Sequence, residues 1–285
     1  MYGLWVCAAS IAGARRSLGV VRMLLLGDTH RNEAFTRKAF VRAKELGCAH
    51  IIQLGDFGYG WNWLQLNDTL AVCRFAASVS LMVDEFGIGF CFLDGNHENF
   101  DQLVNHPLGP DGRREVTPNV WHLPRGYRWE IDGVRFLVCG GATSVDRLAR
   151  TPSVSWWAQE AVTQADVDAC GDESTDVLLT HDAPMTPAFF ENVSTTRYGI
   201  QADLDVLRNK LLLEQVLLAT NPQITVHGHL HRHFVQDLGD GRRMIGLAHD
   251  RAALHRAALV VDTQASGLVE FLEKPASNQA KAGGS

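Results

Sequence analysis

Short runs of apolar residues recur along the chain and predict buried β-strands. Helical patterns separate the early runs, whereas the runs near the C-terminus follow one another more closely. This order is typical of an α/β protein that becomes richer in strands toward its C-terminus. The predicted strands cover residues 20–26, 50–54, 88–93, 134–140, 176–180, 223–227, 243–248, 257–262 and 268–272.

The clearest helical pattern follows the first predicted strand. Phe35, Ala39 and Ala43 form an apolar stripe with helical spacing, and Asn32 precedes it at the position where a side chain caps the first turn. Gly47 follows the last turn, where a glycine commonly ends a helix. The predicted helices cover residues 32–46, 64–86 and 202–219.

The pattern contains neither a low-complexity linker nor an internal repeat, so we expect one domain over residues 20–274. The first strand begins near Val20, which leaves residues 1–19 as an N-terminal extension that we expect to be loosely ordered. Residues 275–285 are small and polar, and this composition predicts a disordered tail.

The amino-acid composition argues against two classes of protein, nucleic-acid-binding proteins and membrane proteins. Hydrophobic residues make up 46% of the 285 residues and charged residues 20%, as in ordinary folded domains. The net charge of −6 argues against a surface dedicated to nucleic acid, which usually carries a basic excess. No apolar run approaches the length of a membrane span, and the six cysteines form no C-x-x-C pair. We therefore expect a cytoplasmic protein without a membrane partner.

Residues capable of binding a metal follow five of the predicted strands. Ligands bind beyond the carboxyl ends of strands in open α/β sheets, so these residues would meet at one edge of the fold. A single aspartate after a strand is usually a turn former, but the joint pattern, with a glycine beside most of these positions, favours one metal site. The residues are Asp28 and His30, Asp56, Asn96 and His97, His181, and His229 and His231.

The ordered motifs GDTH, GDFG, GNHE, THD and GHLH, spread over roughly residues 22–235, resemble those of the calcineurin-like metallophosphoesterase superfamily. The resemblance implies a four-layer αββα sandwich of two mixed β-sheets flanked by helices, with a dinuclear metal centre. By the same resemblance, one ion is held by Asp28, His30 and His231, the other by Asn96, His181 and His229, and Asp56 bridges the two.

A centre of this kind would hydrolyse phosphodiester bonds through attack by a hydroxide that bridges the ions. Carboxylate, amide and imidazole ligands without thiolate suit two divalent ions, with manganese expected ahead of iron or zinc. In the GNHE motif, His97 would face the substrate, where it can stabilise the transferring group or protonate the leaving oxygen. Asp94 would orient His97, or else serve only in a turn.

The substrate is predicted less directly. Arg31, where many relatives have glycine, would reach a phosphate oxygen or point outward. The second motif and Asp94 lack the two phosphate-binding arginines of the protein-phosphatase branch, which disfavours that branch. Tyr59 and Trp61 follow Asp56 and could stack on a base, or belong to the core.

We therefore expect a small phosphoester substrate, with a nucleotide or cyclic-nucleotide diester favoured. Phosphomonoesterase activity, nuclease activity and a non-catalytic binding scaffold are the alternatives. The intact set of ligand positions argues against the scaffold, and the acidic composition argues against the nuclease. The oligomeric state is not predicted. The segment TVHGHLHRHF holds two further histidines: we expect His227 to bond a neighbour at the strand end and His233 to face solvent or the rim of the site.

Overall fold

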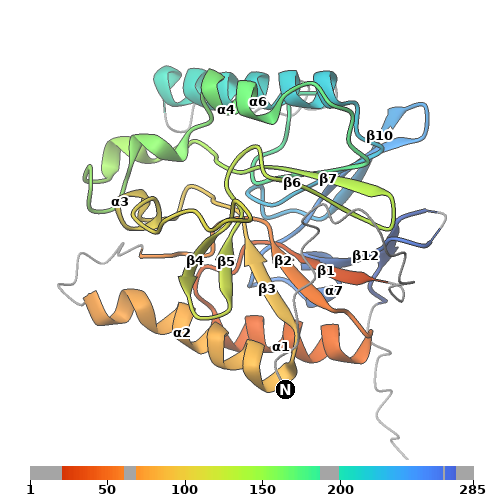
Figure 1. Cartoon of the computed structure of the whole chain (residues 1–285). Helices are drawn as coiled ribbons and strands as arrows, with labels where there is room; N and C mark the ends of the chain where they lie inside the picture. Colours follow the sequence, from red (N-terminus) through yellow and green to blue (C-terminus); the bar gives the residue numbers. More distant parts are fainter. Residues whose placement is uncertain (1–20, 61–68, 187–198, 266, 274–285) are drawn as a thin grey trace, which may run out of the picture.

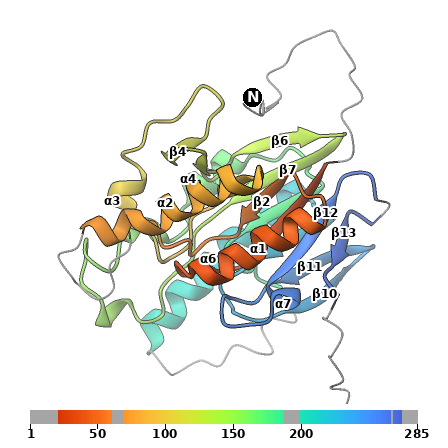
Figure 2. The same ribbon diagram turned by 90° about the horizontal axis from the view of Figure 1, so that it is seen from below.

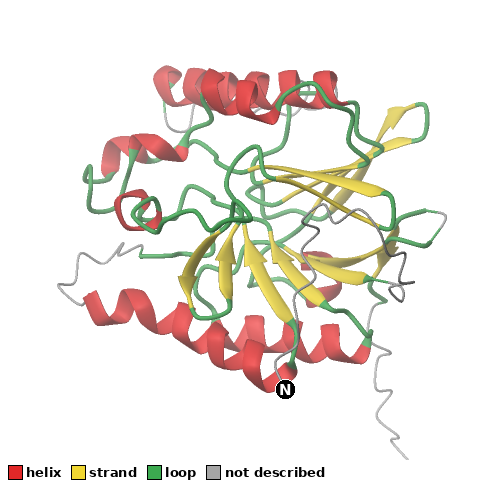
Figure 3. Cartoon of the chain, in the orientation of Figure 1, coloured by secondary structure: helices red, strands yellow, loops and turns green. Residues whose placement is uncertain are grey.

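The computed structural model describes residues 21–60, 69–186, 199–265 and 267–273. The N-terminal extension, the C-terminal tail and Trp61 lie outside these ranges. Two mixed β-sheets pack face to face, and helices cover the outer face of each sheet (Figures 1 and 3). The predicted four-layer αββα class is therefore confirmed.

The first sheet has the strand order β13-β12-β1-β2-β3-β5-β4. Its neighbours β1, β2, β3 and β5 run parallel, whereas β4, β12 and β13 are antiparallel to their neighbours. Four parallel strands therefore end along one edge. The bounds are β1 Arg22–Leu26, β2 His50–Gln53, β3 Gly89–Phe92, β4 Arg114–Thr117, β5 Val120–His122, β12 Ala258–Asp262 and β13 Val269–Phe271.

The second sheet has the order β10-β11-β9-β8-β7-β6, and the central strands β7, β8, β9 and β11 run parallel. The edge strands β6 and β10 pair antiparallel with β7 and β11. The bounds are β6 Arg128–Ile131, β7 Val134–Cys139, β8 Val177–Thr180, β9 Ile224–His227, β10 Phe234–Gly239 and β11 Arg242–Gly246.

Helices α1 and α2 lie side by side across the first sheet, and α4 and α6 cover the second (Figures 1 and 2). Asn32 caps α1 as predicted, because its Oδ1 accepts a hydrogen bond from Phe35 N at 3.0 Å. No helix in the described ranges is long and apolar enough to cross a membrane. The bounds are α1 Glu33–Glu45, α2 Thr69–Phe86, α3 Phe100–Leu103, η1 Arg147–Ala149, η2 Ala158–Glu160, α4 Gln164–Cys170, α6 Ile200–Thr220 and α7 Leu254–Ala257.

Strand β1 shows how the layers follow from the sequence. Leu24 and Leu26 point into the apolar cluster beneath α1 and α2, whereas Met23 and Leu25 join the cluster between the sheets. Successive side chains of a strand point to opposite faces, so a continuous apolar run is buried on both sides. Strands β3, β8 and β9 are likewise buried at every position.

Candidate metal centre

The carboxyl ends of strands from both sheets supply one group of polar side chains. Their possible ligand atoms form two clusters, and within each cluster the atoms lie within 4.8 Å of one another. Asp56 belongs to both. The first cluster consists of Asp28, His30, Asp56 and His231, and the second of Asp56, His181 and His229.

Asp56 lies between the clusters with its two oxygens turned toward different histidines. Oδ1 lies 3.3 Å from His181 Nε2, and Oδ2 lies 3.4 Å from His30 Nε2. The His97 backbone N–H donates to Oδ1 at 2.9 Å, which fixes the carboxylate in this orientation. The side chain is 1% exposed, so both oxygens face the interior of the site.

Asp28 is held in a similar way. Its Oδ1 accepts a hydrogen bond from the His229 backbone N–H at 3.0 Å, and its Oδ2 lies 3.0 Å from His231 Nε2. One oxygen is thus fixed by the backbone of the opposite sheet's loop. The other faces the centre of the first cluster.

The two central histidines present Nε2 to the site. His181 Nδ1–H donates to the Leu54 carbonyl oxygen at 2.7 Å, and His30 Nδ1 lies 3.0 Å from Asp250 Oδ1. A ring nitrogen that donates its hydrogen leaves the lone pair on the other nitrogen, so both Nε2 atoms can bind a cation.

The loops that carry these side chains turn through left-handed backbone. His30, Asp56, His229 and His231 have φ values of 42°, 56°, 61° and 55°, a region that non-glycine residues rarely adopt. Such strain is found mainly where the surrounding structure requires it, often at functional sites.

Glycine at two positions permits the close packing of the site. A Cβ atom on Gly95 would collide with Asp56 Oδ1 and its backbone nitrogen, and a Cβ atom on Gly228 would collide with Asp28 Oδ1. The glycines of the GNHE and GHLH motifs are therefore needed because the two carboxylates approach the backbone there.

Asn96 adjoins the second cluster, with Oδ1 3.3 Å from His181 Nε2. Its Nδ2–H donates to Ser144 Oγ at 3.1 Å, and Ser144 donates in turn to Glu160 Oε2 at 2.8 Å. Glu160 also accepts from the Ser144 backbone N–H. This chain of hydrogen bonds turns the amide oxygen of Asn96 toward the site. Sequence analysis identified neither Ser144 nor Glu160.

Glu160 supports a prediction on stability. Burial raises the pKa of its carboxyl group from 4.5 to about 7, despite the hydrogen bonds from Ser144. Between these values the folded protein keeps a proton that the unfolded chain releases, so the group lowers stability as pH rises from about 4.5 to about 7. The melting temperature of wild type relative to Glu160→Gln should therefore fall across this window and level off above it. A difference that does not vary with pH would contradict the prediction.

Burial and the neighbouring charges shift the pKa values of the site residues in opposite directions. Burial alone would lower the pKa of His30 and His181, but the Asp56 and Asp28 carboxylates raise these values to about 9 and about 10. Burial would raise the pKa of Asp56, but the neighbouring histidines hold it well below its ordinary value. Without a metal, the imidazolium groups neutralise the carboxylates.

His97 lies beside Asp56, with Nε2 3.7 Å from Asp56 Oδ2 and a side chain that is 18% exposed. Burial lowers its pKa to about 4. Asp94 does not take the orienting position predicted for it. Its Oδ2 accepts hydrogen bonds from Arg125 Nε at 3.0 Å and Nη2 at 2.7 Å, and its Oδ1 lies 3.2 Å from His122 Nε2. These contacts give Asp94 a structural role.

The structure places two of the residues suggested as substrate contacts, Tyr59 and Arg31. Tyr59 is buried, its ring packs against Phe92, and its hydroxyl lies 2.6 Å from His106 Nε2. A buried ring cannot stack on a substrate base, so the prediction for Tyr59 is corrected to a core role. The stem of half-buried Arg31 lies against Gly58.

The other two histidines of the segment TVHGHLHRHF lie outside both clusters. His227 is fully buried and its Nδ1 lies 2.9 Å from the Gly228 carbonyl oxygen, in agreement with the predicted bond at the strand end. His233 Nδ1 lies 3.2 Å from the Gly246 carbonyl oxygen, and its ring meets Phe271 edge-on. His233 is therefore part of the packing between strands.

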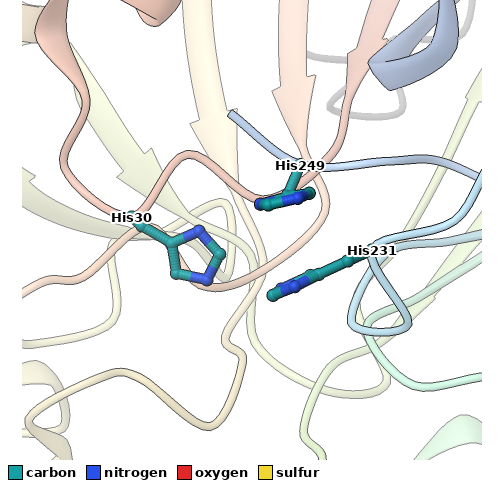
Figure 4. Close-up of side chains that lie close together, drawn as sticks. All are labelled: His30, His231 and His249. Atoms are coloured by element: carbon teal, nitrogen blue, oxygen red, sulfur yellow. The ribbon is translucent and has the colours of Figure 1, made fainter. Parts of the chain in front are cut away.

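Besides Ser144 and Glu160, sequence analysis missed two residues beside the first cluster. His249 and Asp250 follow β11, and His249 forms a third group of possible ligands with His30 and His231 (Figure 4). The signal was present, because they directly follow the predicted strand at 243–248. They stand in no recognisable motif.

The donors suit divalent metal ions. Two fully buried carboxylates lie among imidazoles, and the clusters offer oxygen and nitrogen without thiolate. Although His231 Nε2 is near, Asp28 Oδ2 has no well-aligned hydrogen bond within the described residues. A buried carboxylate oxygen without such a partner is costly, and a cation would satisfy it.

The fold and the clusters define a metal-binding α/β sandwich. The sequence matches the calcineurin-like phosphoesterase family over residues 21–233. The chain therefore belongs to this family, whose members are hydrolases that bind two metal ions. A search of curated proteins gave no match.

The chain is also similar to solved structures at low sequence identity. The crystal structure of TT1561 of Thermus thermophilus has a TM-score of 0.52 and 12% identity, and the match covers 90% of this chain and 99% of that one. A dimetal phosphatase from Danio rerio has a TM-score of 0.47 and 13% identity, with coverage of 85% and 92%.

Proposed function

We propose that the protein hydrolyses phosphodiester bonds of small substrates with two divalent ions bound at the two clusters. The observation that carries the proposal is the position of Asp56, whose two oxygens face different clusters. One ion would be held by Asp28, His30 and His231, the other by Asn96, His181 and His229, and Asp56 would bind both.

The bound ions would lower the pKa of water and neutralise charge on the phosphoryl oxygens. The protein contributes orientation: backbone N–H groups fix one oxygen of Asp28 and one of Asp56, and Ser144 turns the amide of Asn96. His97, partly exposed beside Asp56, would contact the transferring group, the role that its lowered pKa favours, or supply a proton at the leaving oxygen.

We favour a diester over a monoester as the substrate because Arg31 is not placed as a phosphate contact, while Arg150 lies within electrostatic reach of His97. A phosphate monoester carries up to two negative charges and benefits from cationic side chains. Arg31, the arginine nearest to the first motif, packs its stem against Gly58 and lies within electrostatic reach of buried Glu98. A singly charged diester needs less of such help. The nucleotide preference now rests on Trp61 and its neighbours, which lie outside the described residues. Manganese is the proposed ion, with iron or zinc as alternatives.

The test compares bis-p-nitrophenyl phosphate, p-nitrophenyl phosphate, cyclic nucleotides and single-stranded DNA as substrates of protein with measured metal content. We expect the small diesters to be hydrolysed fastest, activity to disappear on chelation, and manganese to restore it. Asp56→Asn, purified identically, controls for contaminating enzymes. Faster hydrolysis of the monoester would favour a phosphomonoesterase, and inactivity with two bound ions would favour a scaffold.

A further inference from the structure

The segment after β11 reaches the metal centre from the second sheet. Strand β11 pairs parallel with β9, with Gly246 beside His227, so the chain beyond β11 lies next to the GHLH segment. His249 stacks on His231 with ring centroids 4.2 Å apart and an angle of 12° between the planes (Figure 4). Because an imidazole binds a metal in the plane of its ring, one of these two rings must turn for both to bind the same ion. It meets His30 edge-on at 6.1 Å.

Asp250 links this segment to the first cluster. Its Oδ1 lies 3.0 Å from His30 Nδ1 and 3.4 Å from His249 Nδ1. Its Oδ2 accepts a hydrogen bond from Asn32 Nδ2 at 2.9 Å. Asn32 is itself fixed as the cap of α1, through its Oδ1. Asp250 is therefore anchored to the end of a helix and not a loose surface carboxylate.

The position of Asp250 influences which nitrogen each ring offers, through a hydrogen bond to His30 Nδ1 and through the proximity of its charge to His249 Nδ1. A carboxylate accepts hydrogen bonds only, so it favours the tautomers of His30 and His249 that carry hydrogen on Nδ1. The lone pair then resides on Nε2 of both rings. In metal sites a carboxylate commonly orients a ligating histidine in this way, and its loss typically weakens metal binding about 10-fold to 100-fold.

We propose that His249 is a further ligand of the ion at the Asp28 cluster and that Asp250 is the positioning residue for His30 and His249. The ligand atoms of His30, His231 and His249 lie within 4.8 Å of one another, as those of the first cluster do. The proposal rests on the proposed function, because it requires a metal at this cluster.

The added imidazole makes the two ion positions unequal. The Asp28 position would have three imidazole donors, whereas the Asn96 position would have two, from His181 and His229. Imidazole favours zinc, iron, cobalt and nickel over manganese. The Asp28 position should therefore bind cobalt more tightly than the Asn96 position does, and it should be the one that changes when His249 is replaced.

Titration of metal-free protein with Co²⁺ tests this proposal by stoichiometry, affinity and the visible absorption of the bound ion. His249→Phe keeps a ring beside His231 but removes the donor, and Asp250→Asn removes the charge. His233→Phe is the matched control, because His233 lies nearby but outside the clusters. His249→Ala serves if the phenylalanine variant does not fold.

We expect wild type to bind two ions, and the absorption spectrum of the more tightly bound ion should change in His249→Phe. This variant should bind that ion at least about 10-fold more weakly and the other ion normally. Asp250→Asn should also bind the more tightly bound ion at least about 10-fold more weakly, whereas His233→Phe should bind both ions as wild type does. If His249→Phe binds two ions with wild-type affinity and spectrum, the proposal on His249 is wrong and the proposed function stands. A higher KM for substrate in this variant would not change that conclusion. Absence of metal binding by wild type would overturn the proposed function as well.

Discussion

Asp56→Asn should release both metal ions and reduce turnover more than about 100-fold, beyond the loss typical of residues that only support a ligand. The reason is that its two oxygens face His181 and His30, which belong to different clusters. Asparagine retains the shape and one acceptor but loses the charge. Metal analysis of the purified variant measures the effect.

His231→Ala is the comparison for Asp56→Asn. His231 belongs to the first cluster and not to the second, so its loss should weaken one ion and leave the other. Thermal unfolding of both variants shows whether the fold is retained. Two ions retained at wild-type affinity in Asp56→Asn would contradict a shared carboxylate, and equal losses in both variants would contradict the division into two positions.

His97→Ala should keep both ions and the fold but lose turnover in a way that depends on the leaving group. General acid catalysis typically contributes about 100-fold to 10,000-fold. A p-nitrophenolate leaves without a proton, so hydrolysis of bis-p-nitrophenyl phosphate should fall modestly. A nucleoside alkoxide requires a proton, so hydrolysis of a nucleotide diester should fall far more.

The ratio of these two rates, measured on His97→Ala with confirmed metal content, separates the roles open to His97. A ligand would lose metal, and both substrates would fail together. A structural residue would lower thermal stability and leave the ratio unchanged. An unchanged ratio at full metal content would remove the proton-donating role, although contact with the phosphoryl group would remain compatible with it.

The sequence predicted the buried parts of the fold well because burial leaves a pattern. The double-sided apolar strand at 22–26 and the capped helix beginning after Asn32 are both found. Strands β4, β5, β6 and β10 were not predicted. Strands β4, β6 and β10 lie at the edges of the sheets and contain polar, partly exposed residues, as in the alternating exposure of β10. Strand β5 lies inside the first sheet but has only three residues, too few to leave a pattern. Pairing partners, which the sequence does not reveal, define such strands.

The candidate site was predicted where strand ends carry recognisable motifs. For Asp94 and Tyr59 the sequence left two roles open, because proximity in sequence to a motif does not give the direction of a side chain: Asp94 turns to Arg125 and His122, and Tyr59 turns into the core. Ser144 could not have been identified, because its importance arises from contacts across the sandwich.

The division of the ligand atoms between the sheets has a consequence for how the protein is made. Asp28, His30 and Asp56 come from the first sheet, whereas His181, His229 and His231 come from the second. During synthesis on the ribosome the first group emerges long before the second. The growing chain therefore lacks the second cluster until residue 229 has been added, and the first until residue 231 has been added, and both require the sheets to dock. Strand β12, which pairs with β1, emerges later still. Hydrolytic capacity thus requires segments that are translated late relative to the first ligands, and products that end before residue 229 should not carry it.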